Sequence, residues 1–124
     1  MFFNKLKLMK ECFPESWLRK LPLLFFKADT IEVKGEIASM CITKGDRIIL
    51  LCTGKKHRRK GYAGKLIRRS KATQTYTYEG NKAGLNAWIK NGFRLVNTVD
   101  SPFGRRHILI RKASSGSRKP PSSS

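Results

Sequence analysis

Acidic residues are scarce in this chain of 124 residues, where 8 Asp and Glu stand against 27 Lys and Arg and the formal net charge is +19. A domain so charged attracts polyanions whatever its fold, so DNA, RNA, an anionic membrane surface and phosphorylated cofactors are candidate partners. The shortage of carboxylates disfavours polyamines and histone tails, because they need an acidic groove. We therefore expect a nucleic-acid partner, and an acidic protein stays open as an alternative.

Cysteine is also rare, with Cys12, Cys41 and Cys52 as its three occurrences. The odd count and the lack of CxxC spacing argue against a disulfide framework and against a zinc site, so no metal is expected. Each cysteine has apolar neighbours in the sequence. We predict three buried free thiols, and from them a location in the reducing cytoplasm.

Long apolar runs are absent. No stretch reaches the roughly 18 apolar residues that a transmembrane helix needs. The first residues are interrupted by Lys5, Lys7 and Lys10, and no small-residue cleavage site follows, so no signal peptide is expected. The apolar run at 21–26 is too short to span a membrane and is expected to pack into the core. A membrane-surface contact of this run is the lesser alternative, and no membrane partner is predicted.

The length allows one domain with one hydrophobic core. Apolar periodicity and turn residues predict strands at 31–33, 36–43, 47–52, 73–78, 93–99 and 105–111, and helices at 15–21, 62–70 and 81–91. Pro14 is expected to open the first helix and Pro22 to stop it. This order of elements predicts an α/β fold, a single mixed sheet of the α+β kind. Residues 113–124 are Ser, Gly, Lys, Arg and Pro and are expected to form a disordered tail.

The most informative segment joins the buried strand at 47–52 to the helix at 62–70. It is strongly basic and lies between Gly54 and Gly61. A helix start presents backbone N–H groups without partners and the positive end of the helix dipole, which together bind anions. Gly61 and Gly64 allow a ligand to approach the backbone closely. The segment therefore predicts a phosphate-binding turn.

The spacing Arg58-x-x-Gly61-x-Ala63 resembles the pyrophosphate motif of the GNAT superfamily of acyl-CoA N-acyltransferases. A second segment strengthens the resemblance. Asn81 is followed seven residues later by Trp88 and then by Asn91-Gly92-Phe93, similar to the helix and strand that follow the motif in that family. The resemblance covers residues 31–112.

The resemblance implies a GNAT-like single domain over residues 1–112 with a reduced N-terminal lobe, which would leave the acceptor site open to a large substrate. It implies transfer of an acyl group, acetyl or another, from acyl-CoA to an amine. Carried over, the backbone amides of about residues 59–64 would hold the pyrophosphate. The expected cofactor-binding residues are Cys52, Arg58, Arg59, Lys60, Gly61, Tyr62, Ala63, Gly64, Lys65 and Asn81.

The chain departs from the family at Trp88, where a Tyr often protonates the leaving thiolate. An indole N–H donates a hydrogen bond but is no usable acid. Tyr76 or Tyr78 are the substitutes, with sheet packing as their alternative role. Glu79 and then Glu36 are the candidates for the general base, unless they are solvated charges or partners of nearby cations. We take Glu79, Tyr78 and Trp88 as the candidate catalytic residues, and His57 is expected to be a surface contact to phosphate or water.

Nine Lys and Arg and no acid occur within residues 54–71, which is more positive charge than acyl-CoA requires. Such density indicates contacts to a phosphate backbone. The expected nucleic-acid contacts are Lys55, Lys56, Arg68, Arg69 and Lys71. A nucleobase amine or an amine attached to tRNA is thus the favoured acceptor. The alternative is a catalytically weak module that binds nucleic acid or an acidic protein without turnover; the sequence leaves monomer and dimer open.

Overall fold

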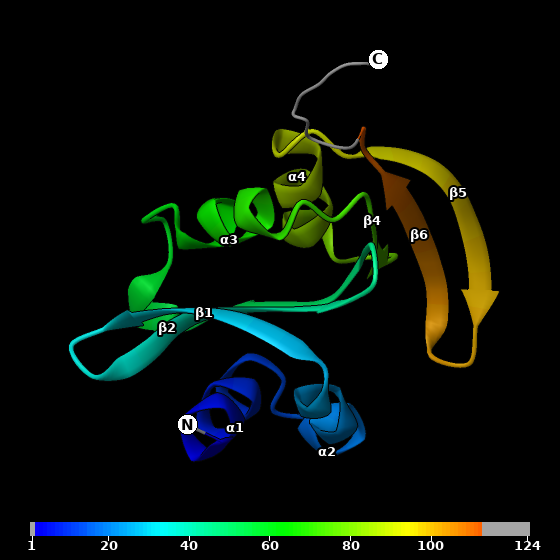
Figure 1. The fold of residues 1–124 in the computed structure, drawn as a ribbon. Coiled ribbons are helices and arrows are strands. Elements are labelled where there is room, and N and C mark those ends of the chain that lie inside the picture. Colours follow the sequence, from blue (N-terminus) through cyan, green and yellow to red (C-terminus); the bar gives the residue numbers. More distant parts are fainter. Residues whose placement is uncertain (1, 113–124) are drawn as a thin grey trace. The chain divides into compact units, whose positions relative to one another are not determined.

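The computed structural model describes residues 2–112, which divide into two compact units, the first ending at Ser70 and the second beginning at Lys71 (Figure 1). The expected tail at 113–124 lies outside the described residues. Within the described range, no helix has the length and apolar character needed to cross a membrane.

The first unit contains most of the helices. Its elements are α1 (Phe2–Cys12), α2 (Trp17–Lys20), the 3-10 helix η1 (Leu21–Phe25), β1 (Lys27–Val33), β2 (Glu36–Lys44), β3 (Arg47–Thr53), the 3-10 helix η2 (Lys55–His57) and α3 (Tyr62–Ser70). The three strands form an antiparallel meander with β2 in the centre. Gly35 and Gly45 make the two turns with positive φ, where an L side chain would be strained.

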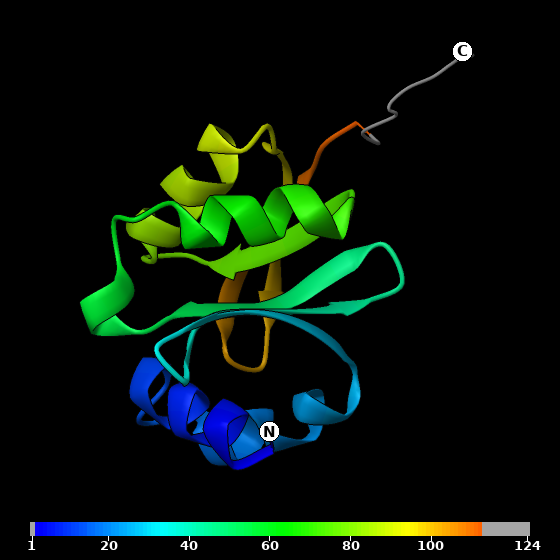
Figure 2. The ribbon, with the colours of Figure 1, turned by 60° about the vertical axis from the view of Figure 1, so that its left-hand side comes forward.

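The strand β2 is buried on both faces, because helices cover each side of the meander. Figure 2 shows α1 and α2 on one face and α3 on the other. Leu8 and Met9 of α1 pack on Met40 of β2, and Leu66 and Ile67 of α3 are fully buried. A strand covered on both faces reads as a nearly continuous apolar run, which explains why periodicity placed it well.

The N-terminal region differs from expectation. The helix α1 was not predicted, because lysines interrupt its apolar residues. Pro22 does not stop the helical region, since it lies in the first turn of η1, where a missing N–H breaks no hydrogen bond. The run at 21–26 packs into the core only in part: Leu24 is buried, whereas Phe25 is 86% exposed. The reduced N-terminal lobe therefore consists of α1, α2 and η1, which are joined by short connections.

A disulfide joins Cys12, the last residue of α1, to Cys52 in β3. The prediction of three free thiols was therefore wrong for these two residues, and Cys41 lies buried outside the disulfide. The Cα atoms of the pair are 6.1 Å apart although the residues are separated by 40 positions. Only the docking of α1 against β3 brings them together, so cysteine spacing gave no signal.

The second unit is a smaller antiparallel arrangement of β4 (Gln74–Tyr78), α4 (Lys82–Lys90), β5 (Arg94–Ser101) and β6 (Gly104–Ile110). Strand β6 lies between β4 and β5. The β5–β6 hairpin closes where the Ser101 hydroxyl donates to the Gly104 carbonyl at 2.6 Å. Thr75, Thr77 and Leu109 are buried in this unit. With helices and strands in both units, the predicted α/β class is confirmed.

Candidate functional site: the turn before α3

The segment between β3 and α3 has an irregular backbone. After η2, Arg58 is extended, Arg59 has a φ of +65° and Gly61 a φ of +82°, and α3 begins at Tyr62. A positive φ is unusual for a residue with a side chain such as Arg59. Glycine at position 61 avoids that strain, and a Cβ built there would meet no atom within 4 Å. The backbone of this turn therefore faces open space.

The first amides of α3 are available to a ligand. The Lys65 N–H donates to the Gly61 carbonyl at 3.1 Å and begins the hydrogen bonding of the helix. The preceding amides of Tyr62, Ala63 and Gly64 have no acceptor in the part of the chain that the structure describes, as expected for a helix start. These N–H groups lie at the positive end of the helix dipole, and they could donate hydrogen bonds to an anion such as a pyrophosphate.

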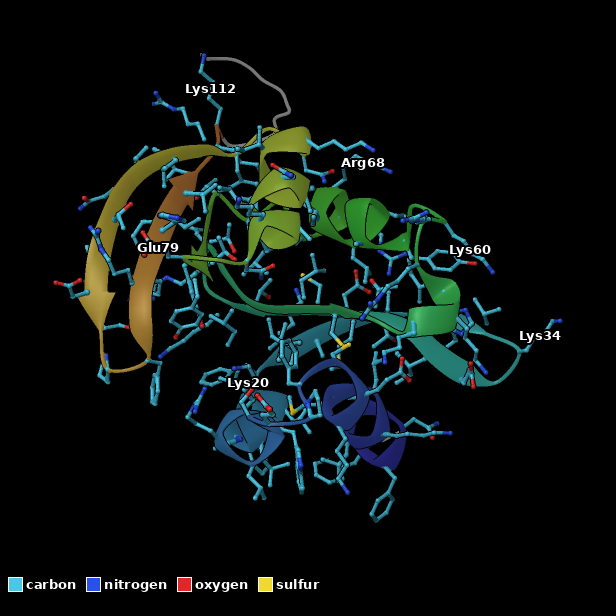
Figure 3. The ribbon with its side chains drawn as sticks, turned by 180° about the vertical axis from the view of Figure 1, so that it is seen from behind. Lys20, Lys34, Lys60, Arg68, Glu79 and Lys112 are labelled. Carbon is cyan, nitrogen blue, oxygen red and sulfur yellow. A yellow bond between two sulfur atoms is a disulfide. The ribbon has the colours of Figure 1, made fainter. Side chains whose placement is uncertain are left out.

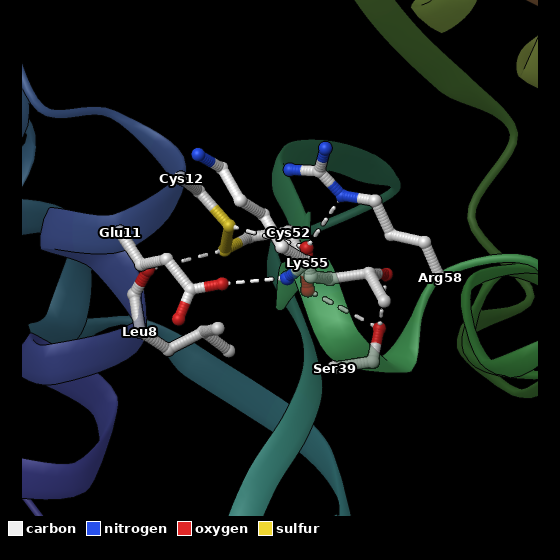
Figure 4. The surroundings of a disulfide bond; sticks show 8 residues. Leu8, Glu11, Cys12, Ser39, Cys52, Lys55 and Arg58 are labelled. Carbon is white, nitrogen blue, oxygen red and sulfur yellow. Dashed lines mark hydrogen bonds between the residues drawn. A yellow bond between two sulfur atoms is a disulfide. The ribbon is translucent and has the colours of Figure 1, made fainter.

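The end of α1 holds the turn from one side (Figure 4). The Lys55 N–H donates to the Glu11 carboxylate at 2.6 Å, and the neighbouring Cys12 is bonded to Cys52. Gly54 is buried between them, and an added Cβ would lie 3.2 Å from the Glu11 oxygen. Sequence reasoning missed Glu11, since a helix at 2–12 had to be recognised first. The side chain of Cys52, predicted to bind cofactor, faces α1 instead.

A second carboxylate, at the start of β2, also holds this segment. Glu36, at the start of β2, lies 2.7 Å from His57 Nε2 and 2.8 Å from Lys56 Nζ. His57 is only 7% exposed, so its prediction as a surface contact was wrong. Hydrogen bonds from Lys56 and then His57 lower the Glu36 pKa to about 2. Glu36 therefore stays an anion and acts as a partner of basic residues, one of the roles left open for it.

Acid should release this second attachment. Because the Glu36 pKa is lower in the folded chain than its ordinary 4.5, its bonds stabilise the fold above that value and are lost as the pH falls toward about 2. We expect the protection of the His57 amide, which donates to the Gly54 carbonyl, to fall through this window once exchange rates are corrected for the intrinsic effect of pH. Glu36→Gln should remove the pH dependence, and Glu32→Gln, at an exposed position on β1, should keep it. Unchanged protection in the wild-type chain at a pH below the Glu36 pKa would contradict the assignment.

Two of the residues expected to contact nucleic acid have partners within the first unit. Arg69 Nε donates to the Asp29 carboxylate at 2.8 Å and this bond lowers the Asp29 pKa, while Lys56 is paired with Glu36. Lys55 and Arg68 are exposed with no acidic side chain paired to theirs among the described residues. Lys71 is exposed at the start of the second unit. The candidate contacts are thus unequal, and Arg68 is the clearest on α3.

In the second unit, Asn81 is the N-cap of α4. Its side-chain oxygen accepts a hydrogen bond from the Gly84 N–H at 3.0 Å, and its amide nitrogen donates to the Thr77 hydroxyl at 3.2 Å. An added Cβ on Gly84 would lie 2.6 Å from the Asn81 side chain, which explains the glycine. Both polar ends of Asn81 serve the local structure, so its role in cofactor binding stays a prediction.

The three candidate catalytic residues have different surroundings. Trp88 is 6% exposed and packs edge-on against Phe93, with 5.4 Å between ring centroids. Tyr78 is half-buried, and its ring lies edge-on to that of Tyr76 at 6.0 Å. Glu79 is exposed, with an oxygen 4.0 Å from Arg105. Trp88 therefore has the contacts of a packing residue, and Tyr78 offers the less exposed of the two ionisable groups.

The structure is similar to several solved acetyltransferases. A GNAT-family acetyltransferase from Bacillus cereus ATCC 10987 matches with a TM-score of 0.59 at 17% identity over 70% of each chain. The ribosomal-protein-S18-alanine N-acetyltransferase from Escherichia coli matches at 0.63 and 14%, over 92% of this chain and 90% of that one. A Bacillus subtilis acetyltransferase in complex with CoA matches at 0.67 and 16%, over 86% and 90%.

The chain has the GNAT fold. No family model matches its sequence, and no curated protein sequence matches it significantly. The assignment of residues 58–64 to a pyrophosphate motif rests on the sequence resemblance and stays a prediction.

Proposed function

We propose that this GNAT-fold chain is an N-acyltransferase that takes acetyl-CoA or another acyl-CoA and passes the acyl group to an amine. The main support is the start of α3, where the N–H groups of residues 62–64 have no hydrogen-bond acceptor among the described residues. They lie in the segment that resembles the family's motif, in a fold for which a Bacillus subtilis neighbour was solved with CoA. We propose a cytoplasmic location, although the Cys12–Cys52 disulfide removes two of the three free thiols from which the sequence predicted it.

Acyl-CoA supplies an activated thioester, and the residues of the chain bind it and move protons. The amide groups and the basic side chains of residues 58–60 hold its phosphates. We assign Tyr78 as the donor of the proton that the leaving thiolate needs, because a phenol can act as an acid and the Trp88 indole cannot. Glu79, an exposed carboxylate, is assigned to collect the proton of the acceptor amine, directly or through water.

We propose nucleic acid as the acceptor, through a nucleobase amine or an amine attached to tRNA. Basic side chains on the turn and on α3 are exposed and lack acidic partners within residues 2–112; they are Lys55, Arg59, Lys60, Lys65 and Arg68. Lys60 and Arg68 both project outward from the first unit in Figure 3. Acyl-CoA needs few of these charges, so the rest are free to contact a phosphate backbone.

Two other functions have an observation in their favour. A protein amine as acceptor is favoured by the neighbour from Escherichia coli, whose name describes acetylation of an alanine in a ribosomal protein. Binding without turnover is favoured by Trp88, which stands buried where the family often has its catalytic Tyr. Both of these functions would use the same turn as the proposed enzyme. They differ from it in the molecule, if any, that receives the acyl group.

Label transfer separates the three functions. Purified protein is incubated with labelled acetyl-CoA and, separately, with duplex DNA, single-stranded DNA, bulk tRNA and protein extract. We expect label on a nucleic-acid fraction, at a rate that falls steeply with salt because binding releases counterions. Label on protein alone would show a protein acyltransferase. Nucleic-acid binding without any label would show a binding module.

A matched pair of variants tests the cationic surface in the same assay. Arg68→Ala should lower transfer to nucleic acid and leave acetyl-CoA affinity unchanged. Arg47→Ala removes the same charge from an exposed position at the opposite end of β3 and should have no effect. Equal loss in both variants would mean that net charge alone, and not this surface, attracts the acceptor.

A further inference from the structure

We propose that the Cys12–Cys52 disulfide is a reversible redox site at which a dithiol reductant controls the order of the phosphate-binding turn. The inference rests on the proposed function for its ligand, acyl-CoA, but not for the chemistry of the disulfide. In the reducing cytoplasm that we propose for the enzyme, disulfides are usually transient or regulatory and not structural.

The disulfide lies at the base of the turn. Cys52 precedes Lys55 by three residues, and Cys12 follows Glu11 at the end of α1. The Glu11 carboxylate accepts the Lys55 N–H at 2.6 Å. The same short stretch of α1 is thus joined to β3 by a covalent bond and to the turn by a hydrogen bond. Cleavage of the disulfide would therefore also loosen the placement of the Glu11 carboxylate.

The two sulfur atoms differ in access. Cys52 is buried, whereas Cys12 is half-buried, so an external thiolate reaches the Cys12 sulfur first. Figure 4 shows the side chains of Lys55 and Arg58 extending beside the disulfide. Arg58 Nε also donates to the Thr53 carbonyl at 3.2 Å, which holds that guanidinium near the sulfur atoms. Positive charge favours a departing thiolate, so both cations assist the opening of the bond.

The exchange balances in two steps. The thiolate of the dithiol attacks the Cys12 sulfur, the S–S bond breaks, and Cys52 leaves as a thiolate that takes up a proton. The second thiol of the reductant, as a thiolate, then attacks its own sulfur in the mixed disulfide. Cys12 leaves and is protonated, and the reductant becomes an intramolecular disulfide, so two electrons pass to the protein.

The reduced chain retains acceptors for both thiols. Cys52 Sγ lies 3.5 Å from the Leu8 carbonyl oxygen, and Cys12 Sγ lies 3.6 Å from the Thr53 carbonyl oxygen. Once the sulfur atoms have moved apart, each thiol therefore has a nearby carbonyl to which it can donate a weak hydrogen bond. Reduction is expected to loosen the end of α1 and the turn while the rest of the unit stays folded. A looser turn must be ordered when acyl-CoA binds, which weakens binding.

The test compares oxidised and dithiothreitol-reduced wild-type protein by three measurements. Alkylation after unfolding should count one thiol in the oxidised chain, Cys41, and three after reduction. Amide exchange at Lys55 should be faster after reduction. Calorimetry should show acetyl-CoA binding about tenfold more weakly, since pre-organisation is lost. Re-oxidation should restore all three.

Two variants serve as controls. Cys12→Ser should behave like the reduced protein and lose its response to the reductant, whereas Cys41→Ala should keep the response. Three alkylated thiols in air-oxidised protein, or unchanged Lys55 exchange and affinity after reduction, would overturn the proposal. If exchange responds while acetyl-CoA fails to bind in either state, the redox site stands and the proposed function is wrong.

Discussion

Gly61→Glu is expected to abolish acyl-CoA binding. The new carboxylate would lie at the start of α3, where we propose that the free amides and the helix dipole attract the pyrophosphate, and would repel it. It would also strain the backbone, since Gly61 has a φ of +82°. For the wild-type chain we expect micromolar affinity, about −8 kcal/mol. Calorimetry with acetyl-CoA measures both proteins.

A matched control separates the site from the strain. Gly45 in the β2–β3 turn has a φ of +61°, and a Cβ there would also meet no atom within 4 Å. Gly45→Glu therefore changes backbone strain and net charge in a similar way at a different place, and should leave affinity intact. Equal loss in the two variants would remove the turn from the cofactor site. Wild-type protein that ignores millimolar acetyl-CoA would remove the cofactor itself.

Trp88→Ala should lower the free energy of unfolding by roughly 3–5 kcal/mol, the usual effect of truncating a large buried aromatic residue. Trp88 is 6% exposed, and its contact with Phe93 ties α4 to the start of β5. Chemical denaturation followed by circular dichroism measures the change. A loss below about 1 kcal/mol would contradict a packing role, since such small values are typical of surface positions.

The neighbouring residue is the control. Ile89 is 51% exposed on the same helix, so Ile89→Ala should change the free energy of unfolding by only a fraction of the Trp88 effect. Trp88→Tyr should keep the fold, because it preserves an aromatic ring. If it also raises acyl transfer, position 88 faces the thioester as the family resemblance implied. A folded Tyr variant with unchanged turnover would leave Tyr78 as the proposed acid.

The two attachments of the turn change how its basic residues are understood. Lys56 and His57 are held by Glu36, and Arg69 by Asp29. Glu11, which accepts from the Lys55 N–H, is a third carboxylate with such a role. Three of the eight acidic residues of the chain therefore hold the segment 53–69 against neighbouring elements. The unpaired cations remain on the outer surface, where a polyanion can reach them.

Local pattern was sufficient for much of the fold. The apolar run of β3, the stripe of Leu66 and Ile67 on α3, and the glycine turns were predicted close to their observed bounds. The irregular turn before α3 was also predicted, because a helix start and its glycines are set by neighbouring residues, whereas its binding of phosphate stays a prediction. Helix α1 was missed, since its stability comes from packing Leu8 and Met9 on the sheet and not from a strong local signal.

By itself, then, the sequence determined the charge of the molecule, the order of its strands and helices after residue 30, and the irregular backbone turn before α3. The charge follows from composition, and the other two features depend on residues close together in the chain. The tertiary structure alone decided that Cys12 is bonded to Cys52, that Glu11 accepts a hydrogen bond from Lys55, and that Glu36 is paired with His57. Each pair is far apart in sequence, and only the docking of α1 and β2 beside the turn determines which distant side chains come into contact.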